Sequence, residues 1–284
     1  MFDRFFHERR YENSHYNFTN LFMWRKAYKI QWTVEGNFLC VKACWEGENF
    51  FLPPFGPEQG LTEVLGKMLE HAEEQKFHFM LQGVEKYMIE WLEKIKPGYF
   101  KCSAERDNFD YVYLCKDLIE LKGRKFHTKK NHVNGFRKKH SNYEYVPMTA
   151  DMTDQCIAFM VEWCNERGCV KGDSVDCERK AILEAMNNFS VLGFHGAAIF
   201  IGGKMVAFTY GEVSTEDTVV IHVEKGLLEY KGVYGVINQE FCARQWQHIE
   251  YINREEDMGI EGLRKAKESY QPVKMVEKYI VTIK

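Results

Sequence analysis

Positive charge is concentrated in one segment of this 284-residue chain, between residues 122 and 140. The segment holds eight Lys or Arg residues and three His residues, and no acid lies between Glu120 and Glu144. The whole chain carries a formal charge of −3, so the remainder without these eight cations stands at −11. Cations ranged along a helix neutralise successive phosphates, which predicts a phosphate-rich partner. The alternative is a solvated helix between domains. The residues expected to bind a nucleic-acid partner are Lys122, Lys125, Lys129, Lys130, Arg137 and Lys138.

A glycine-bearing loop follows a predicted strand and opens a helix near Val233. Free backbone amides at a helix start bind anions, and glycine allows a phosphate to approach them closely. The alternative is an ordinary turn in which Gly226, Gly232 and Gly235 only satisfy the backbone angles. The expected donor and phosphate-binding residues are Lys231, Gly232, Tyr234, Gly235, Asn238 and Arg264.

Three consecutive acids, Glu255 to Asp257, follow another predicted strand, so we expect them to project from its end into a cleft. A carboxylate there can take a proton from an attacking amine or hydroxyl. A cation such as Lys267 can polarise a carbonyl, and Tyr270 can donate a proton to a leaving group. The alternative is a loop whose acids cap the next helix. The expected catalytic residues are Glu256, Asp257, Lys267 and Tyr270.

Other chemistries leave no recognisable pattern. The nine cysteines include no C-x-x-C, so we expect no metal site, and their apolar surroundings are typical of reduced thiols in a cytoplasmic protein. No apolar run reaches the roughly 18 residues that span a bilayer, and no signal-peptide core is present. No catalytic Ser-His-Asp, Cys-His, Walker or dinucleotide motif is found, and no tightly bound cofactor is expected.

The order of elements is clearest in the second half. Apolar spacing predicts helices over 151–167 and 176–188, a hairpin around Gly202-Gly203 and a third strand over 218–224. A helix from residue 233, a strand over 248–253, a short helix over 262–269 and a strand over 273–283 complete it. His222 lies on the strand face opposite Val219, Ile221 and Val223, and we interpret it as a packing residue.

The first half repeats this order of elements in outline, without sharing residues. Strands are predicted over 28–34, 38–43, 49–52, 77–81, 99–103 and 111–114, with helices over 61–72 and 84–95. We place the domain division near Asn142. Residues 1–142 then form a first domain that ends in the basic helix, and residues 143–284 form a second domain that carries the site.

Two resemblances give these patterns a context. Three strands followed by a glycine loop and a helix resemble the core of the GCN5-related N-acetyltransferases, in which this loop holds the pyrophosphate of coenzyme A. Here Tyr234 and Glu229 depart from the usual loop pattern. The segments DYVYLCKDLIELKGRKFHTKKNHVNGF, from Asp110, and YINREEDMGIEGLRKAKESYQPV, from Tyr251, resemble a bacterial family similar to the C-terminal catalytic domain of phosphatidylglycerol lysyltransferase.

The resemblance implies an α/β (α+β) fold of two tandem acyl-CoA N-acyltransferase-like domains, each a mixed sheet flanked by helices, as in the Fem-type aminoacyltransferases. It implies an acyltransferase that uses aminoacyl-tRNA as co-substrate and transfers the aminoacyl group to an amine or hydroxyl of a small molecule, peptide or lipid. An acyl-CoA donor and a non-catalytic RNA-binding or regulatory protein are the alternatives. Peripheral contact with a membrane through the basic segment is a third.

Overall fold

The computed structural model describes residues 2–6, 8–168 and 174–284, and the chain forms two compact units. Unit 1 consists of residues 1–110, 256–260 and 275–284, and unit 2 consists of residues 111–255 and 261–274. Each unit has one mixed sheet with helices packed against it, so the predicted fold class is confirmed.

Unit 1 is built around a six-stranded sheet in which β3 and β4 are parallel and the other neighbouring strands whose pairing register is given are antiparallel. In spatial order its strands are β1 (Gln31–Glu35), β2 (Phe38–Trp45), β3 (Glu48–Phe51), β4 (Met80–Val84), β13 (Tyr279–Ile283) and β5 (Phe100–Ala104). Its helices are α1 (Asp3–Phe6), α2 (Phe18–Trp24), α3 (Leu61–Glu74), α4 (Lys86–Ile95) and the 3-10 turn η1 (Arg106–Asn108).

Both faces of the first sheet are buried around β2, and the alternation along that strand explains how. Phe38 and Cys40 point into a cluster with the apolar stripes of α3 and α4. Leu39 and Val41 point into a second cluster with aromatic residues of the N-terminal segment. β2 therefore reads as a nearly continuous apolar run, as expected for a strand covered on both sides.

Unit 2 is built around a seven-stranded sheet. In spatial order its strands are β12 (Lys274–Val276), β6 (Asp110–Leu114), β11 (Tyr251–Asn253), β10 (Thr218–Gly226), β9 (Lys204–Thr215), β8 (His195–Ile201) and β7 (Glu144–Pro147). Its helices are α5 (Cys115–Glu120), α6 (His127–Lys139), α7 (Thr153–Arg167), α8 (Ser174–Asn187), α9 (Phe189–Leu192), α10 (Val233–Gln245) and α11 (Glu261–Glu268), with 3-10 turns η2 (Arg124–Phe126) and η3 (Ala150–Met152).

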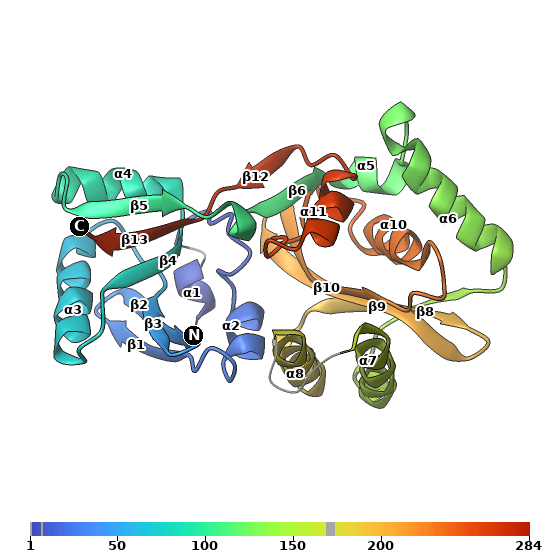
Figure 1. Ribbon diagram of the computed structural model, residues 1–284, viewed down its shortest axis with the longest axis horizontal. Helices are drawn as coiled ribbons and strands as arrows, with labels where there is room; N and C mark the ends of the chain where they lie inside the picture. Colours follow the sequence, from blue (N-terminus) through green and yellow to red (C-terminus); the bar gives the residue numbers. More distant parts are fainter. Residues whose placement is uncertain (1, 7, 169–173) are drawn as a thin grey trace. The chain divides into compact units, whose positions relative to one another are not determined.

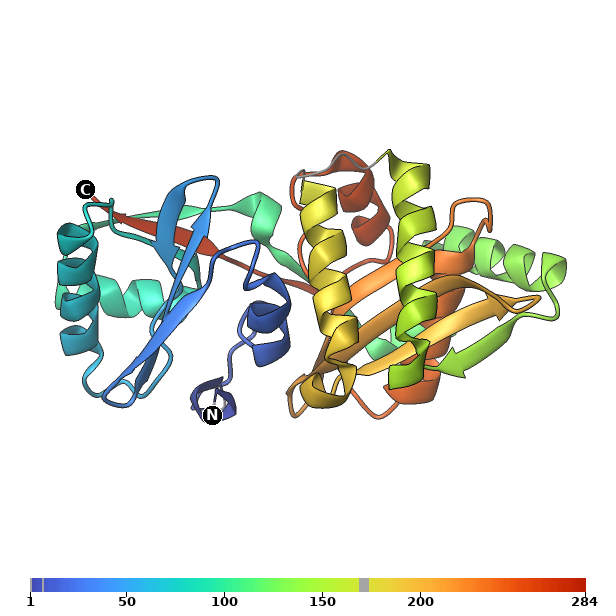
Figure 2. The same ribbon diagram turned by 90° about the horizontal axis from the view of Figure 1, so that it is seen from below.

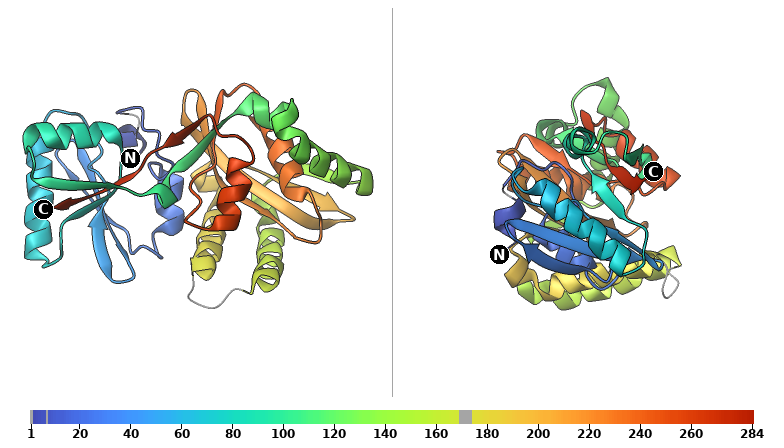
Figure 3. Two further views of the ribbon diagram at one scale, coloured as in Figure 1. Left: turned by 45° about the horizontal axis from the view of Figure 1, so that its top comes forward. Right: turned by 90° about the vertical axis from the view of Figure 1, so that its left-hand side faces the viewer.

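The helices of unit 2 cover both faces of its sheet. Figure 1 and Figure 2 show α7 and α8 side by side on one face. α10 packs on the opposite face, against β8, β9 and β10, and α5 and α6 pack against α10 (Figure 3). α10 begins at Val233, as the loop pattern predicted, after Gly232 in the left-handed conformation with φ +94°. The basic segment forms α6, which buries Val133 and Phe136 and exposes most of its cations.

The division of the chain differs from the predicted boundary near Asn142. It lies between residues 110 and 111, because β6 pairs with β11 of the second sheet and α6 packs on α10. The predicted strand over 273–283 is also two strands. β12 joins the second sheet and β13 joins the first, where it pairs with β4 and β5. Local periodicity predicts that a strand exists but not which strand it pairs with, which explains both differences.

Candidate functional site

The strands β10 and β11 separate in the middle of the second sheet. Their parallel pairing runs from Thr218 and Tyr251 to Val220 and Asn253, whereas β10 itself continues to Gly226 alongside β9. The chain that leaves β11 at Asn253 is therefore free to place its next side chain beside the unpaired part of β10. Polar groups of several elements meet at this separation point.

An ion pair lies at the separation point. Nη2 of Arg254 donates to Oε1 of Glu224 at 2.8 Å, and Nδ2 of Asn238, on α10, donates to Oε2 of the same carboxylate at 3.1 Å. Both charged side chains are about one-tenth exposed, at 12% for Arg254 and 10% for Glu224. Within the described residues, Nη1 of Arg254 and Oδ1 of Asn238 are buried and have no hydrogen-bond partner. Buried polar atoms are costly unless bonded, so this donor and this acceptor are suited to a bound polar group.

Two aromatic rings and a lysine complete the cluster. The guanidinium carbon of Arg254 lies 4.8 Å from the ring centroid of Tyr270 and 5.6 Å from that of Tyr113. Nζ of Lys129, on α6, lies 4.2 Å from the centroid of the Tyr270 ring, so that ring contacts two cations. Burial raises the pKa of Tyr270 to about 12, although the charge of Arg254 opposes the shift. We call Glu224, Asn238, Arg254, Tyr270 and Lys129 the separation-point cluster.

His222 forms a second polar group on β10. Its ring nitrogens lie 2.9 Å from Oε1 of Glu212 and 2.9 Å from Oε1 of Glu255, and its side chain is 1% exposed. A neutral imidazole has a single N–H, so both contacts are hydrogen bonds only when the ring is protonated. Burial opposes that charge, but the two carboxylates outweigh it and raise the pKa of His222 to about 9. His222 is thus a buried cation between two acids. Its interpretation from the sequence as a packing residue did not predict this charge.

The three consecutive acids do not point to a common place. Glu255 binds His222 in unit 2. Glu256 lies 3.2 Å from Nε2 of His15 and 3.2 Å from Nζ of Lys278, all in unit 1. Asp257 is fully buried in unit 1, where its carboxylate accepts hydrogen bonds from Arg106 and from the backbone of Gly259. Glu256 and Asp257, predicted as catalytic, thus hold the loop after β11 in the described contacts.

The side chain of Lys267 also forms hydrogen bonds with the backbone after β11. Its Nζ donates to the carbonyl oxygens of Arg254 at 2.5 Å and Glu255 at 3.0 Å, and its own carbonyl accepts from the hydroxyl of Tyr113. These bonds fix the turn that presents Arg254. Arg264 lies one turn earlier on α11 and is half-buried. Of the four predicted catalytic residues, Tyr270 alone contributes its side chain to the separation-point cluster.

The start of α10, predicted to bind the donor phosphates, is covered by α6. A Cβ added to Gly232 would lie 2.5 Å from the carbonyl oxygen of His132, and one added to Gly235 would lie 2.9 Å from Val133. These glycines therefore allow two helices to pack closely. Tyr234 accepts a hydrogen bond from Trp163, and Lys231 is exposed. Asn238 belongs to the separation-point cluster.

The predicted nucleic-acid-binding residues point in different directions. Arg137 is held by Glu240 at 2.6 Å and by the hydroxyl of Tyr143, so it fastens α6 to α10. Lys125 pairs with Asp117 at 2.9 Å, and Lys129 turns toward Tyr270. Lys122, Lys130 and Lys138 are exposed.

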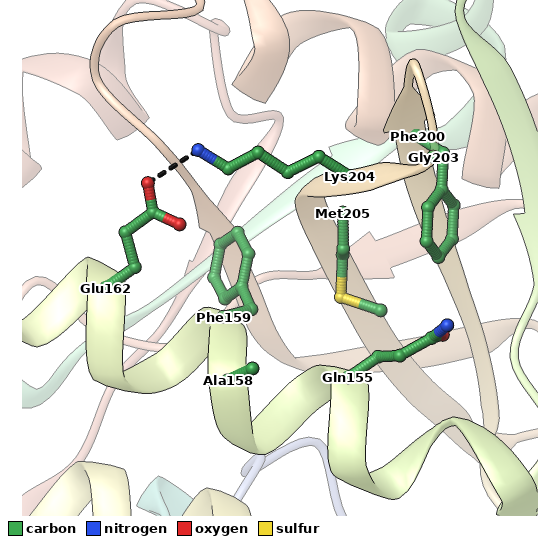
Figure 4. A pocket seen from close by; sticks show the side chains of 8 residues that line it. All are labelled: Gln155, Ala158, Phe159, Glu162, Phe200, Gly203, Lys204 and Met205. Carbon is green, nitrogen blue, oxygen red and sulfur yellow. Dashed lines mark hydrogen bonds and ion pairs between the residues drawn. The ribbon is translucent and has the colours of Figure 1, made fainter.

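A depression of about 160 Å³ lies elsewhere on unit 2, between α7 and the β8–β9 hairpin (Figure 4). Phe159, Phe200 and Met205 give it an apolar floor, and Lys204 spans its rim to Glu162 at 2.6 Å. None of the predicted site residues lines it. Within the described residues, no group of three or more His, Cys, Asp or Glu side chains is arranged to hold a metal ion. None of the described helices is both long and apolar enough to span a bilayer.

The chain matches one protein family over almost its whole length. Residues 8–282 match the family described as phosphatidylglycerol lysyltransferase, C-terminal. The chain belongs to this family. Membership and fold together indicate an acyltransferase.

Three solved structures are similar over almost the whole chain. A conserved protein of unknown function from Bacteroides thetaiotaomicron is 40% identical, with a TM-score of 0.92 over 99% of this chain and 96% of that one. L-PGS from Bacillus licheniformis is 17% identical, with a TM-score of 0.67 over 99% and 90%. FemX is 8% identical, with a TM-score of 0.67 over 99% and 95%. The last two show that the tandem acyltransferase-like fold is shared.

Proposed function

We propose that this protein transfers an aminoacyl group from aminoacyl-tRNA to an amine or hydroxyl acceptor. Family membership supports acyl transfer as the reaction, and the position of α6 supports aminoacyl-tRNA as the donor. This one helix directs Lys129 to the separation-point cluster and exposes Lys130 and Lys138 to solvent. A polyanion bound along the exposed cations would have its end close to the cluster. This continuity carries the proposal.

The ester carbonyl of the donor would be received by Arg254. Acyl transfer places negative charge on the carbonyl oxygen, and a fixed, desolvated donor stabilises it far better than water does. The unpartnered Nη1 of Arg254 is such a donor, and Glu224, Tyr113 and Tyr270 hold the guanidinium in place. Oδ1 of Asn238 would accept a hydrogen bond from the aminoacyl group or from the acceptor.

Coenzyme A is the less suitable donor for this geometry. The oxygen of His132 lies against Gly232, where the loop of an acetyl-CoA-dependent enzyme would need room for a pyrophosphate. A carbonyl oxygen is an acceptor, so it repels a phosphate instead of binding it. The same contact leaves the exposed cations of α6 available to a longer polyanion.

Binding and transfer assays test this proposal. Aminoacyl-tRNA should bind and raise the melting temperature, acetyl-CoA should not, and labelled aminoacyl-tRNA should yield a labelled product in the presence of cell-extract acceptors. Removing Lys122, Lys130 and Lys138 together should weaken tRNA binding and reduce the slope of log affinity against log salt by about 2 to 3. The matched control removes the exposed Lys86, Lys94 and Lys101 of unit 1.

A substitution of Arg254 tests the transfer step separately from tRNA binding. Arg254→Lys keeps the positive charge but loses the second guanidinium nitrogen, so transfer should fall by about 100-fold or more while tRNA binding is retained. Stabilisation by acetyl-CoA alone would overturn the choice of donor. Binding of tRNA without any transfer would identify a non-catalytic RNA-binding protein.

A further inference from the structure

We propose that Lys129 carries the proton from the attacking acceptor to the leaving ribose oxygen during acyl transfer. This inference rests on the proposed function and assigns its proton-transfer step. The sequence suggested a different task for Lys129, as one of several phosphate-binding cations of the basic segment. Its surroundings distinguish it from the others.

Lys129 faces inward from α6, whereas Lys130 and Lys138 of the same helix are exposed. Its Nζ lies over Tyr270, whose ring also contacts Arg254. Its neighbour Lys125 pairs with Asp117, and Lys130 is exposed. Within the described residues Lys129 has no hydrogen bond or ion pair, so its amine is available to a substrate. Glu224, the acid of the cluster, is already engaged by Arg254 and Asn238.

The electrostatics of this position favour a neutral amine. Burial and the positive charge of Arg254 lower the pKa of Lys129 to about 8, against the opposing charge of Glu224. About half of the molecules therefore carry an unprotonated Lys129 at pH 8, compared with less than about 1% for an ordinary lysine. The other titratable groups that face this cluster are Tyr113 of β6, Tyr270 after α11 and Cys242 of α10.

These other groups keep their protons at the same pH. Burial raises the pKa of Tyr270 to about 12 and that of Tyr113 above its ordinary value. Contact with Cys115, together with burial, raises the pKa of Cys242. Lys129 is thus the member of the cluster whose proton exchanges near neutral pH, which a general acid–base group requires.

The step balances without another reactant. The neutral acceptor nitrogen bonds to the carbonyl carbon, and the carbonyl oxygen takes negative charge beside Arg254. The nitrogen, now positive, gives one proton to the neutral Lys129 amine. The bond from the carbonyl carbon to the ribose oxygen then breaks, and Lys129 returns the proton to that oxygen. The products are the amide and a free tRNA hydroxyl end, and Lys129 finishes neutral, as it began.

The titration of Lys129 is measurable without any substrate. Lysines of the intact protein are dimethylated with ¹³C-formaldehyde under mild reduction, and their methyl resonances are followed with pH. One resonance should titrate about two pH units below the rest, and it should be absent from Lys129→Arg but present in Lys130→Arg. If the resonance that Lys129→Arg removes titrates with the other lysines, the proposal is overturned.

Transfer assays separate this inference from the function on which it rests. Lys129→Arg should bind aminoacyl-tRNA within about twofold of wild type, because the exposed cations of the basic segment are unchanged. Its single-turnover transfer should fall by about 100-fold and should lose the rise in rate around pH 8 that is expected of the wild type. Lys94→Arg, at an exposed position of α4 in unit 1, should behave like wild type. Equal transfer by wild type and Lys129→Arg overturns the role of Lys129 alone. A wild type that transfers nothing from aminoacyl-tRNA overturns the proposed function, and the role of Lys129 with it.

Discussion

Individual residues of unit 2 owe their charge states to their neighbours more than to their type. Lys129 loses charge because it is half-buried beside a guanidinium, whereas His222 gains charge because two glutamates flank it. The imidazolium of His222 pairs with the side chain of Glu255, in the segment that follows β11. Lys267 donates a hydrogen bond to the backbone carbonyl of the same glutamate. His222 therefore positions the turn that carries Arg254.

His222 makes stability depend on pH in a defined direction. Its pKa is about 9 in the folded protein and about 6.5 when unfolded, so its contribution is complete below about pH 6.5 and is lost as pH rises through 9. The shift corresponds to roughly 3 kcal/mol. His222→Gln should lower the free energy of unfolding by about that amount at pH 6, and by clearly less at pH 10, in urea titrations.

His248, which is exposed in the same unit, provides the control. His248→Gln should leave both values within about 0.5 kcal/mol of wild type. An equal loss for His222→Gln at pH 6 and pH 10 would show that the imidazole is neutral in the folded protein.

Only some residues of the separation-point cluster were predicted from the sequence. Tyr270, Asn238 and Lys129 were all selected from sequence, although Lys129 was given another task. Arg254 and Glu224 were not selected, and one available signal was the position of Arg254 directly after a predicted strand. Glu224 and Arg254 meet because β10 and β11 separate, and strand pairing between distant segments is not encoded in local periodicity.

At the scale of elements, the packing of α6 on α10 determines what the glycines before and within α10 do: they make room for the neighbouring helix. Gly232 precedes α10 in the left-handed conformation and lies against the backbone of His132, while Arg137 fastens the other end of α6 to Glu240. The helix start and its glycines were predictable from the sequence. The role of these glycines was not predictable, because the sequence alone does not distinguish a glycine that makes room for a phosphate from one that makes room for a neighbouring helix.

Gly232→Ala should therefore destabilise the protein by about 2–4 kcal/mol, since both the backbone angle and the contact with His132 become strained. Gly60→Ala is the matched control. Gly60 also precedes a long helix, α3, at φ +89°, but its added Cβ would meet only the ring of Phe38, at 3.3 and 3.8 Å. The control should cost less, about 1–2 kcal/mol in chemical denaturation. Equal losses would mean that the contact between α6 and α10 contributes nothing beyond the backbone angle.

At the scale of the whole molecule, each sheet includes a strand from the other half of the sequence. β6 belongs to the second sheet and β13 to the first. The buried Lys278 lies just before β13, where its ammonium contacts Asp110 at 2.6 Å and Glu256 at 3.2 Å, and the hydroxyl of Ser14 at 3.3 Å. Burial opposes the charge of Lys278, but the two carboxylates outweigh it and raise its pKa. One side chain thus joins four distant segments of unit 1.

Lys278→Met should lower the free energy of unfolding by about 3–5 kcal/mol, because it leaves two carboxylates without their shared cation. Lys101→Met, an exposed change on the neighbouring strand β5, should cost less than about 0.5 kcal/mol. Adding Asp110→Asn to Lys278→Met should recover part of the loss. Strictly additive effects of these two changes would argue against the pairing.

The place of β13 between β4 and β5 also constrains the order in which this protein can be completed. β13 lies between β4 and β5, yet the ribosome makes it after both of them and after all of unit 2. Until it arrives, β4 and β5 each present a bare edge, the kind of surface on which nascent chains aggregate or recruit chaperones. The half of the molecule that is synthesised first is therefore the half that is finished last.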